Sequence, residues 1–151
     1  MPSPQRARAP APPIEPAAIG AAIAELERLQ PLNELTRAVH GAAWCGRDGR
    51  IILAREDVGR HNALDKAIGA LWRARVGAEN GFFVITSRCS FEMVVKTAIF
   101  GAGALVSLSA PTSLALDRAR DFGVALIAVA RADKALSFET RRDGANGGLA
   151  A

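Results

Sequence analysis

Tyrosine is absent from this chain of 151 residues, cysteine occurs only twice, and aromatic residues make up 5% of the sequence. Two cysteines are too few for a disulfide scaffold, so a reducing, cytoplasmic environment is expected. The scarcity of aromatic side chains and the scatter of the arginines argue against a nucleic-acid surface, in which basic and stacking groups alternate. No apolar run approaches the roughly 18 residues that a membrane span needs. Neither nucleic acid nor a membrane is therefore an expected partner.

The common catalytic and metal-binding motifs are also missing. The sequence holds no Walker A motif, no G-x-G-x-x-G and no G-x-S-x-G. His40, His61, Cys45 and Cys89 match no zinc spacing, and the H-x-E and P-C-x-x-C pair of zinc deaminases does not occur. A cysteine near a helix N-terminus gains thiolate character, but lone cysteines on apolar elements are usually packing residues. We therefore predict no metal site and no catalytic residue.

What remains indicates a single folded domain. Half of the residues are apolar, and the net charge is +4. Residues 1–16 are predicted to form a disordered tail rich in proline and alanine, without the apolar core of a secretory signal. The domain is predicted over 17–140, and residues 141–151 are expected to fray. The positive charge is compatible with an anionic partner, and a phosphate-bearing small molecule fits better than a duplex.

Hydrophobic periodicity predicts alternating helices and strands after an initial hairpin. Unbroken apolar strands that alternate with helices are typical of a parallel sheet covered on both faces. We therefore predict an α/β fold with three layers (α/β/α) and a mixed, mostly parallel sheet. The expected elements are a helix near 17–29, a hairpin over 38–55, helices near 62–76, 89–100 and 111–122, and strands near 81–86, 104–109 and 124–130.

Residues 55–69, R-E-D-V-G-R-H-N-A-L-D-K-A-I-G, form the densest polar block of the chain. Asn62 is the expected N-cap of the following helix, with Asp65 at its N3 position. A polar turn that leads into a helix N-terminus can collect backbone N–H groups around an anion, but it can also be a solvated loop. Four side chains are predicted to form the buried stripe of this helix: Leu64, Ile68, Leu71 and Trp72.

The later helices give further local predictions. Glu92 and Lys96 are expected to form an exposed i, i+4 pair, Pro111 fits the first helical position, and Gly123 fits a C-cap. Five side chains of the helix over 89–100 are predicted to face inward: Phe91, Val94, Val95, Ala98 and Ile99.

Polar segments follow three of the predicted strands: T-S-R-C-S, S-A-P-T-S and R-A-D-K. Ligands of open α/β sheets bind outside the carboxyl ends of the strands, so these segments are expected to converge. Ser87 and Arg88 suit phosphate binding at a helix N-terminus, but an ordinary N-cap with a surface arginine explains them as well. For the segment around Thr112 a structural cap is the better explanation.

Four blocks of the chain resemble the FdhD family, the formate dehydrogenase accessory sulfurtransferases. They are T-R-A-V-H-G-A-A, R-E-D-V-G-R-H-N-A-L-D-K, S-R-C-S-F-E-M-V-V-K and S-A-P-T-S-L-A, and they occur in this order. The resemblance implies a cytidine-deaminase-like fold without the deaminase zinc, in a cytoplasmic homodimer. It also implies a role in formate dehydrogenase maturation, in which sulfur passes from a cysteine desulfurase to the molybdenum bis-molybdopterin guanine dinucleotide cofactor.

The family's cofactor segment falls on Val129, Ala130, Arg131, Ala132, Asp133 and Lys134. Together with Ser87 and Arg88 for phosphate and hydrogen-bond contacts, and Thr112 for a hydrogen bond, these are the candidate cofactor-binding residues.

The chain departs from the family pattern in one respect that bears on activity. The catalytic cysteine of the family lies in a C-G-x-C-G loop, and that motif does not occur in these 151 residues. The resemblance therefore implies the cofactor-binding half of an FdhD-type protein, without the half that carries sulfur. A non-catalytic module that binds cofactor or partner, and a non-functional fragment, are the alternatives. The sequence leaves open whether the cysteine loop lies on another chain or upstream of these residues.

Overall fold

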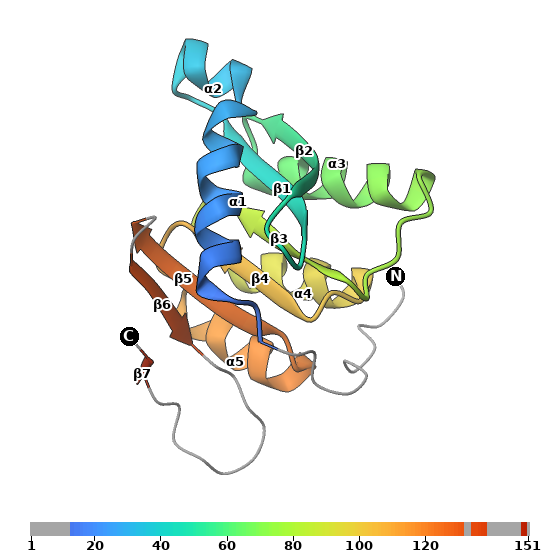
Figure 1. The fold of residues 1–151 in the computed structure, drawn as a ribbon. Helices are drawn as coiled ribbons and strands as arrows, with labels where there is room; N and C mark the ends of the chain where they lie inside the picture. The colour runs from blue at the N-terminus through green and yellow to red at the C-terminus, as the bar shows by residue number, and fades with distance from the viewer. Residues whose placement is uncertain (1–12, 132–133, 139–148, 151) are drawn as a thin grey trace.

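The computed structural model describes residues 13–131, 134–138 and 149–150 (Figure 1). All predicted helices and strands are present, and three elements that were not predicted join them: α2, β6 and β7. The predicted tails fall largely outside the described residues. The helices are α1 (Pro16–Arg28), α2 (Pro31–Thr36), α3 (Arg60–Arg73), α4 (Phe91–Phe100) and α5 (Ser113–Phe122), and the strands are β1 (His40–Gly46), β2 (Ile51–Asp57), β3 (Gly81–Ile85), β4 (Ala104–Ser107), β5 (Ala125–Arg131), β6 (Lys134–Phe138) and β7 (Leu149–Ala150).

One mixed sheet holds all the described strands, in the order β2-β1-β3-β4-β5-β6-β7. Only the β3–β4 and β4–β5 pairings are parallel, whereas the β2–β1, β1–β3, β5–β6 and β6–β7 pairings are antiparallel. The prediction of a mostly parallel sheet is therefore wrong, although the sheet is mixed. There are two causes: β1 is antiparallel to β3 as well as to β2, and β6 turns back along β5, which was expected to be the last strand.

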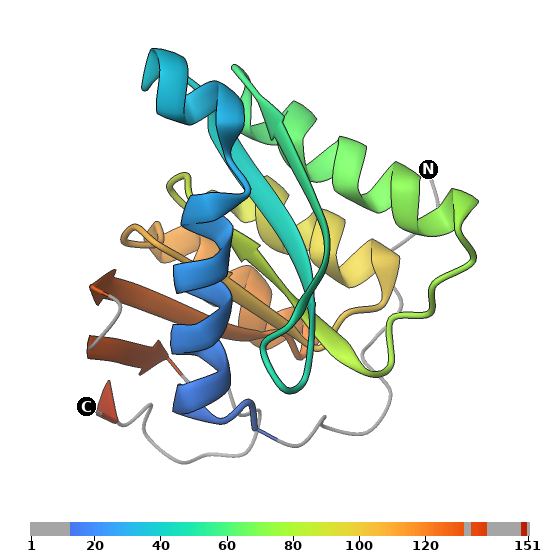
Figure 2. The same ribbon diagram turned by 45° about the horizontal axis from the view of Figure 1, so that its top comes forward.

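Helices cover both faces of the sheet, so the predicted three layers are present. Figures 1 and 2 show α1 on one face, and α3, α4 and α5 on the other. Each face has its own buried cluster, one built around α1 and the other around the three remaining helices. None of the helices in the described part of the chain has both the length and the apolar character to cross a bilayer.

Strand β3 shows why the sequence lacks an alternating pattern here. Every residue of Gly81–Ile85 is buried. Phe82 and Val84 belong to the cluster under α1, and Phe83 and Ile85 belong to the opposite cluster. A strand that is covered on both faces needs apolar residues at successive positions, as was predicted.

Helix α3 begins earlier than predicted. Its N-cap is Gly59, so Asn62 is not the cap and Asp65 is not at N3. Leu64, Ile68 and Leu71 are buried as expected. The predicted burial of Trp72 is wrong, because the residue is 57% exposed; its ring centroid lies 6.4 Å from that of Phe100.

Tertiary contacts also replace two local predictions in α4 and α5. Lys96 pairs with Asp65 of α3 at 2.6 Å, so the expected pair with Glu92 is wrong. Pro111 lies before the N-cap and not at N1. Gly123 is the C-cap with a φ of 67°, as predicted. Among the side chains of α4 predicted to face inward, Val94 and Ala98 are buried, Val95 and Ile99 are half-buried and Phe91 is exposed.

Candidate functional site

The carboxyl ends of β2, β3, β4 and β5 lie at one edge of the sheet. Strands β3, β4 and β5 are mutually parallel, and β2 runs in the same direction because β1 is antiparallel to both β2 and β3. Helices α3, α4 and α5 follow β2, β3 and β4, so all three begin at this edge. We call residues 58–60, 86–90 and 108–112 the loop edge. Helix N-termini present unpaired N–H groups and partial positive charge, so this edge favours an anion.

Hydrogen bonds join the segments after β3 and β4. The Ser107 hydroxyl is buried and lies 3.0 Å from the carbonyl oxygen of Ser87 and 2.8 Å from that of Ser109. The backbone N–H of Thr112 donates to the carbonyl of Cys89 at 3.1 Å. Cys89 and Pro111 also form an isolated parallel bridge. These contacts hold the segments in one arrangement.

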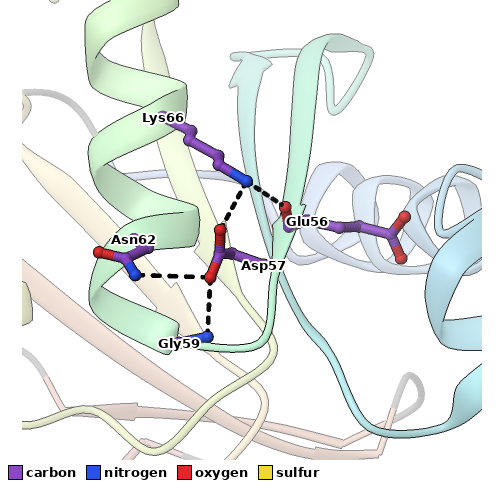
Figure 3. A network of polar contacts seen from close by, with 5 residues as sticks. All are labelled: Glu56, Asp57, Gly59, Asn62 and Lys66. Atoms are coloured by element: carbon purple, nitrogen blue, oxygen red, sulfur yellow. Dashed lines mark hydrogen bonds and ion pairs between the residues drawn. The ribbon is translucent and has the colours of Figure 1, made fainter.

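The turn between β2 and α3 is organised by Asp57 (Figure 3). Its carboxylate accepts a hydrogen bond from the Gly59 N–H at 2.9 Å and pairs with Lys66 at 2.5 Å. The Asn62 side-chain amide donates a longer hydrogen bond of 3.5 Å to Oδ1, the oxygen that also accepts from Gly59, whereas Lys66 pairs with Oδ2. These interactions, the Lys66 hydrogen bond foremost, lower the pKa of Asp57. The polar block around residue 57 therefore shapes the start of α3.

Charged groups at the starts of α3 and α4 face one another. The pKa of Glu92 is lowered, first by its own backbone N–H and then by the Ser90 hydroxyl, with smaller electrostatic contributions from the nearby His61 and Arg60 side chains. The contact from Ser90 is loose, since its Oγ has no partner at hydrogen-bonding geometry. The Nε of Arg60 is likewise buried without a partner. The first turn of α4 thus already holds one carboxylate, which balances part of the local positive charge.

The structure places three of the predicted site residues at the loop edge. Ser87 is buried, with its carbonyl bound to Ser107, while Arg88 is exposed just before α4. Thr112 is the N-cap of α5, and its hydroxyl accepts the N–H of Ala115 at 3.1 Å. The structural explanation for Thr112 is thereby confirmed, and its hydroxyl keeps one proton to donate.

The segment carried over from the family follows β5. Val129 is buried in the cluster under α1, and Ala130 lies near the end of the strand. Arg131 and Lys134 are paired across the β5–β6 hairpin, so their backbones flank the loop edge on the side of β5. Ala132 and Asp133 lie outside the described residues.

Both thiols are buried in the core. Burial raises the pKa of Cys45 to about 12, helped by the charges of Glu25 and Asp48, and burial alone raises the pKa of Cys89 to about 12. A thiol with such a pKa is almost wholly protonated at neutral pH and is a poor nucleophile. No cluster of three or more potential metal ligands occurs within the described residues.

The sequence did not single out three residues that the structure brings into the site. Ser107 was part of a strand, Glu92 was assigned to an exposed pair, and Arg60 was one of several charges in the polar block. A serine that ends a fully buried strand was a signal for Ser107, because a buried hydroxyl needs hydrogen-bond partners. Nothing local marked Arg60 or Glu92, since their proximity arises from the packing of α3 beside α4.

The chain is similar to known proteins in sequence and in fold. The FdhD/NarQ family model matches residues 2–142. The chain is 48% identical over 122 residues to the "Sulfur carrier protein FdhD" of Variovorax paradoxus and 50% identical over 131 residues to that of Chromobacterium violaceum. A crystal structure described as a formate dehydrogenase accessory protein, from Desulfotalea psychrophila, superposes with a TM-score of 0.76 at 34% identity.

The matches cover most of this chain but only part of each relative. They span 81% of the chain and 44% of the Variovorax protein, 85% and 48% for the Chromobacterium protein, and 82% and 53% for the Desulfotalea structure. The chain thus spans about half the length of the relatives that it matches. With the family model covering nearly the whole sequence, the chain belongs to the FdhD/NarQ family.

Proposed function

We propose that this chain is the cofactor-binding portion of an FdhD-type sulfur carrier that acts in formate dehydrogenase maturation. The cofactor that it binds as cargo would be molybdenum bis-molybdopterin guanine dinucleotide. The protein would act as a cytoplasmic homodimer with the cytidine-deaminase-like fold of the family. The observation that carries the proposal is the convergence of three helix N-termini and the exposed Arg88 at one sheet edge. Such an edge suits the pyrophosphate groups of the cargo.

The roles of the site residues follow from their positions. Arg88, Arg131 and Lys134 would contact phosphate oxygens, and Ser87 and Thr112 would hydrogen-bond to the cargo. Val129 and Ala130 would shape the end of β5, and Ala132 and Asp133 would complete the segment. Thr112 can serve while it caps α5, because a hydroxyl accepts one hydrogen bond and donates another.

The sulfur that a cysteine desulfurase supplies must be carried by a cysteine other than Cys45 or Cys89. Both thiols are buried, and burial raises the pKa of each to about 12, so neither is presented as an accessible thiolate that could accept sulfur. This favours a second candidate function, a non-catalytic module that holds cofactor or docks on formate dehydrogenase. A sulfur-transfer assay with added cysteine desulfurase and a cysteine-loop polypeptide distinguishes the two candidate functions. The cofactor-binding portion of a sulfur carrier would support transfer in this assay, whereas a non-catalytic module would bind cofactor but transfer no sulfur.

Guanosine diphosphate reproduces the guanine, ribose and pyrophosphate of the cargo and serves as the test ligand. Calorimetric titration is expected to show binding that weakens with salt and weakens further in Arg88→Ala. Arg73→Ala is the matched control, because Arg73 is also exposed but lies at the opposite end of α3. No binding at millimolar nucleotide, or equal losses in both variants, would refute the assignment.

A further inference from the structure

Helix α2 presents leucines to solvent and buries none of its own residues. Leu32 is 50% exposed and Leu35 is 83% exposed, and Leu29, three residues before Leu32, is 42% exposed. We call these three side chains the leucine face. Three of the eight large apolar side chains exposed in the described part of the chain thus fall within seven residues. Single exposed leucines are ordinary, but three of them at the end of α1 and on α2 are a candidate interaction site.

The helix is nevertheless held in a fixed position. The Glu56 carboxylate accepts the N–H groups of Leu32 and Asn33, each at 3.0 Å. Figure 3 shows the Glu56 side chain pointing away from α3, opposite to its neighbour Asp57. A helix of six residues is not stable by itself, and α2 has no buried side chains to hold it against the core. The two hydrogen bonds to Glu56 therefore stabilise it in place of core packing.

The far end of α2 is fixed as well. The Thr36 hydroxyl donates to the Leu32 carbonyl at 2.9 Å and accepts the N–H of Ala38 at 3.2 Å. Arg37 ends the helix in the left-handed region, with a φ of 53°. Both ends of α2 are thus bonded, while its apolar side chains face solvent. An element that is held by polar bonds and buries nothing is suited to meet another molecule.

The leucine face lies next to the loop edge. Helix α2 leads directly into β1, whose second residue, Gly41, donates its N–H to the hydroxyl of Thr86 at 2.9 Å. In Figures 1 and 2, α2 projects beyond the sheet near the end of β2. A polypeptide seated on α2 would therefore lie within reach of the proposed cofactor site.

We propose that the leucine face docks the portion of an FdhD/NarQ protein that has no counterpart in this chain. The match covers 48% of the Chromobacterium relative and 53% of the chain in the Desulfotalea structure, so about half of each protein has no counterpart in this chain. In a full-length relative, the unmatched and matched portions belong to one molecule. The matched portion must therefore carry part of that contact surface, and among the helices that the structure describes α2 is the one that buries none of its own residues. The proposal rests on family membership and extends the proposed function.

The occupant is specified by the chemistry of this surface. The three exposed leucines call for an apolar segment. The docked portion would place its own residues beside Thr86 and Arg88.

Co-expression tests the docking directly. The unmatched portion of the Chromobacterium violaceum relative, carrying an affinity tag, is co-expressed with the untagged chain. The molar mass of the recovered complex is then measured by light scattering over a series of protein concentrations, without nucleotide. A one-to-one complex is expected, weakened by about tenfold or more in Leu35→Asp. Leu114→Asp, at another leucine that is 44% exposed, on α5, is expected to leave it intact. Thermal melts check that both variants fold.

Three results would overturn the proposal. One is the absence of a complex with the wild-type chain, and another is a complex that Leu35→Asp leaves unchanged. The third is a homodimer of the chain alone that Leu35→Asp dissociates, because the face would then be a self-interface. Since the complex is measured without guanosine diphosphate, its loss is independent of failure of the cofactor site.

Discussion

Replacing Glu56 with alanine removes the anchor of α2 without touching the core. The carboxylate accepts two backbone N–H groups at 3.0 Å, and no other side chain in the described residues caps the start of this helix. Loss of a helix cap typically costs about 1 kcal/mol. Two bonds at a partly exposed site should therefore cost roughly 1–2 kcal/mol, or about a 5- to 30-fold rise in the population with α2 open.

Hydrogen exchange followed by mass spectrometry measures this opening. The amides of Glu34 and Arg37 report it, because they donate to Gln30 and Asn33 within the helix. Their exchange should accelerate in Glu56→Ala, while exchange in β3 and β4 stays close to wild type. Glu34→Ala is the control: it removes a charge from the first turn of α2 but no backbone contact, so a change of a few tenths of a kcal/mol is expected. Equal acceleration in the two variants, or none in Glu56→Ala, would refute the role of Glu56.

Three further predictions concern the core and the titrating groups. In urea titrations, Gly81→Ala should lower the free energy of unfolding by about 1–3 kcal/mol, because a Cβ at this position would collide with the Cys45 carbonyl and the Trp44 ring. Gly69→Ala is the control: a Cβ there would have only Arg73 Nη2 nearby, at 4.0 Å, and alanine stabilises a helix relative to glycine, so the free energy of unfolding should rise by about 0.5–1 kcal/mol. Cys45 and Cys89 should resist alkylation by iodoacetamide until the chain unfolds, and rapid alkylation under native conditions, measured by mass spectrometry, would contradict this. The free energy of unfolding should also fall as the pH rises from 9.0, the pKa of the thiols in the unfolded chain, towards 12, because the folded state then binds more protons than the unfolded state. Because the pKa of Asp57 is lower in the folded protein than its value of 3.8 in the unfolded chain, the ionised carboxylate stabilises the fold above pH 3.8, and this stabilisation is lost as the pH falls through the folded pKa. The difference in urea midpoint between wild type and Asp57→Asn should therefore become smaller in acid. A difference that does not change with pH would show that it does not come from the ion pair with Lys66.

The order of the helices and strands could be predicted from the sequence because each of these elements has a local sequence signal, such as an apolar run or a capping residue. Phe82 and Val84 alternate with Phe83 and Ile85 between two clusters, which leaves an unbroken apolar run, and Gly123 marks the end of α5. The direction of the strands was less accessible. Strand β6 was overlooked because Lys134 was assigned to a binding segment, so the second antiparallel hairpin was missed.

The caps and ion pairs failed for a different reason. Asn62 was a sound local candidate for the N-cap, but the acceptor that organises the turn is Asp57, which comes from the preceding strand. Lys96 had a partner one turn away in Glu92, yet Asp65 of the neighbouring helix lies 2.6 Å from it. Local propensity gives the competing partners, and only packing decides between them. For the candidate site, the sequence found the loops but not the charges of Arg60 and Glu92 that packing brings between them.

The buried Ser107 hydroxyl has a consequence for how tightly this edge can hold a ligand. By contacting Ser87 and Ser109 at once, it joins two segments that would otherwise sample independent conformations. A site that is already ordered loses little conformational entropy on association, so more of the contact energy is available as affinity. The same rigidity should make the edge selective for shape, since a ligand of different dimensions cannot draw one segment towards it without moving the other.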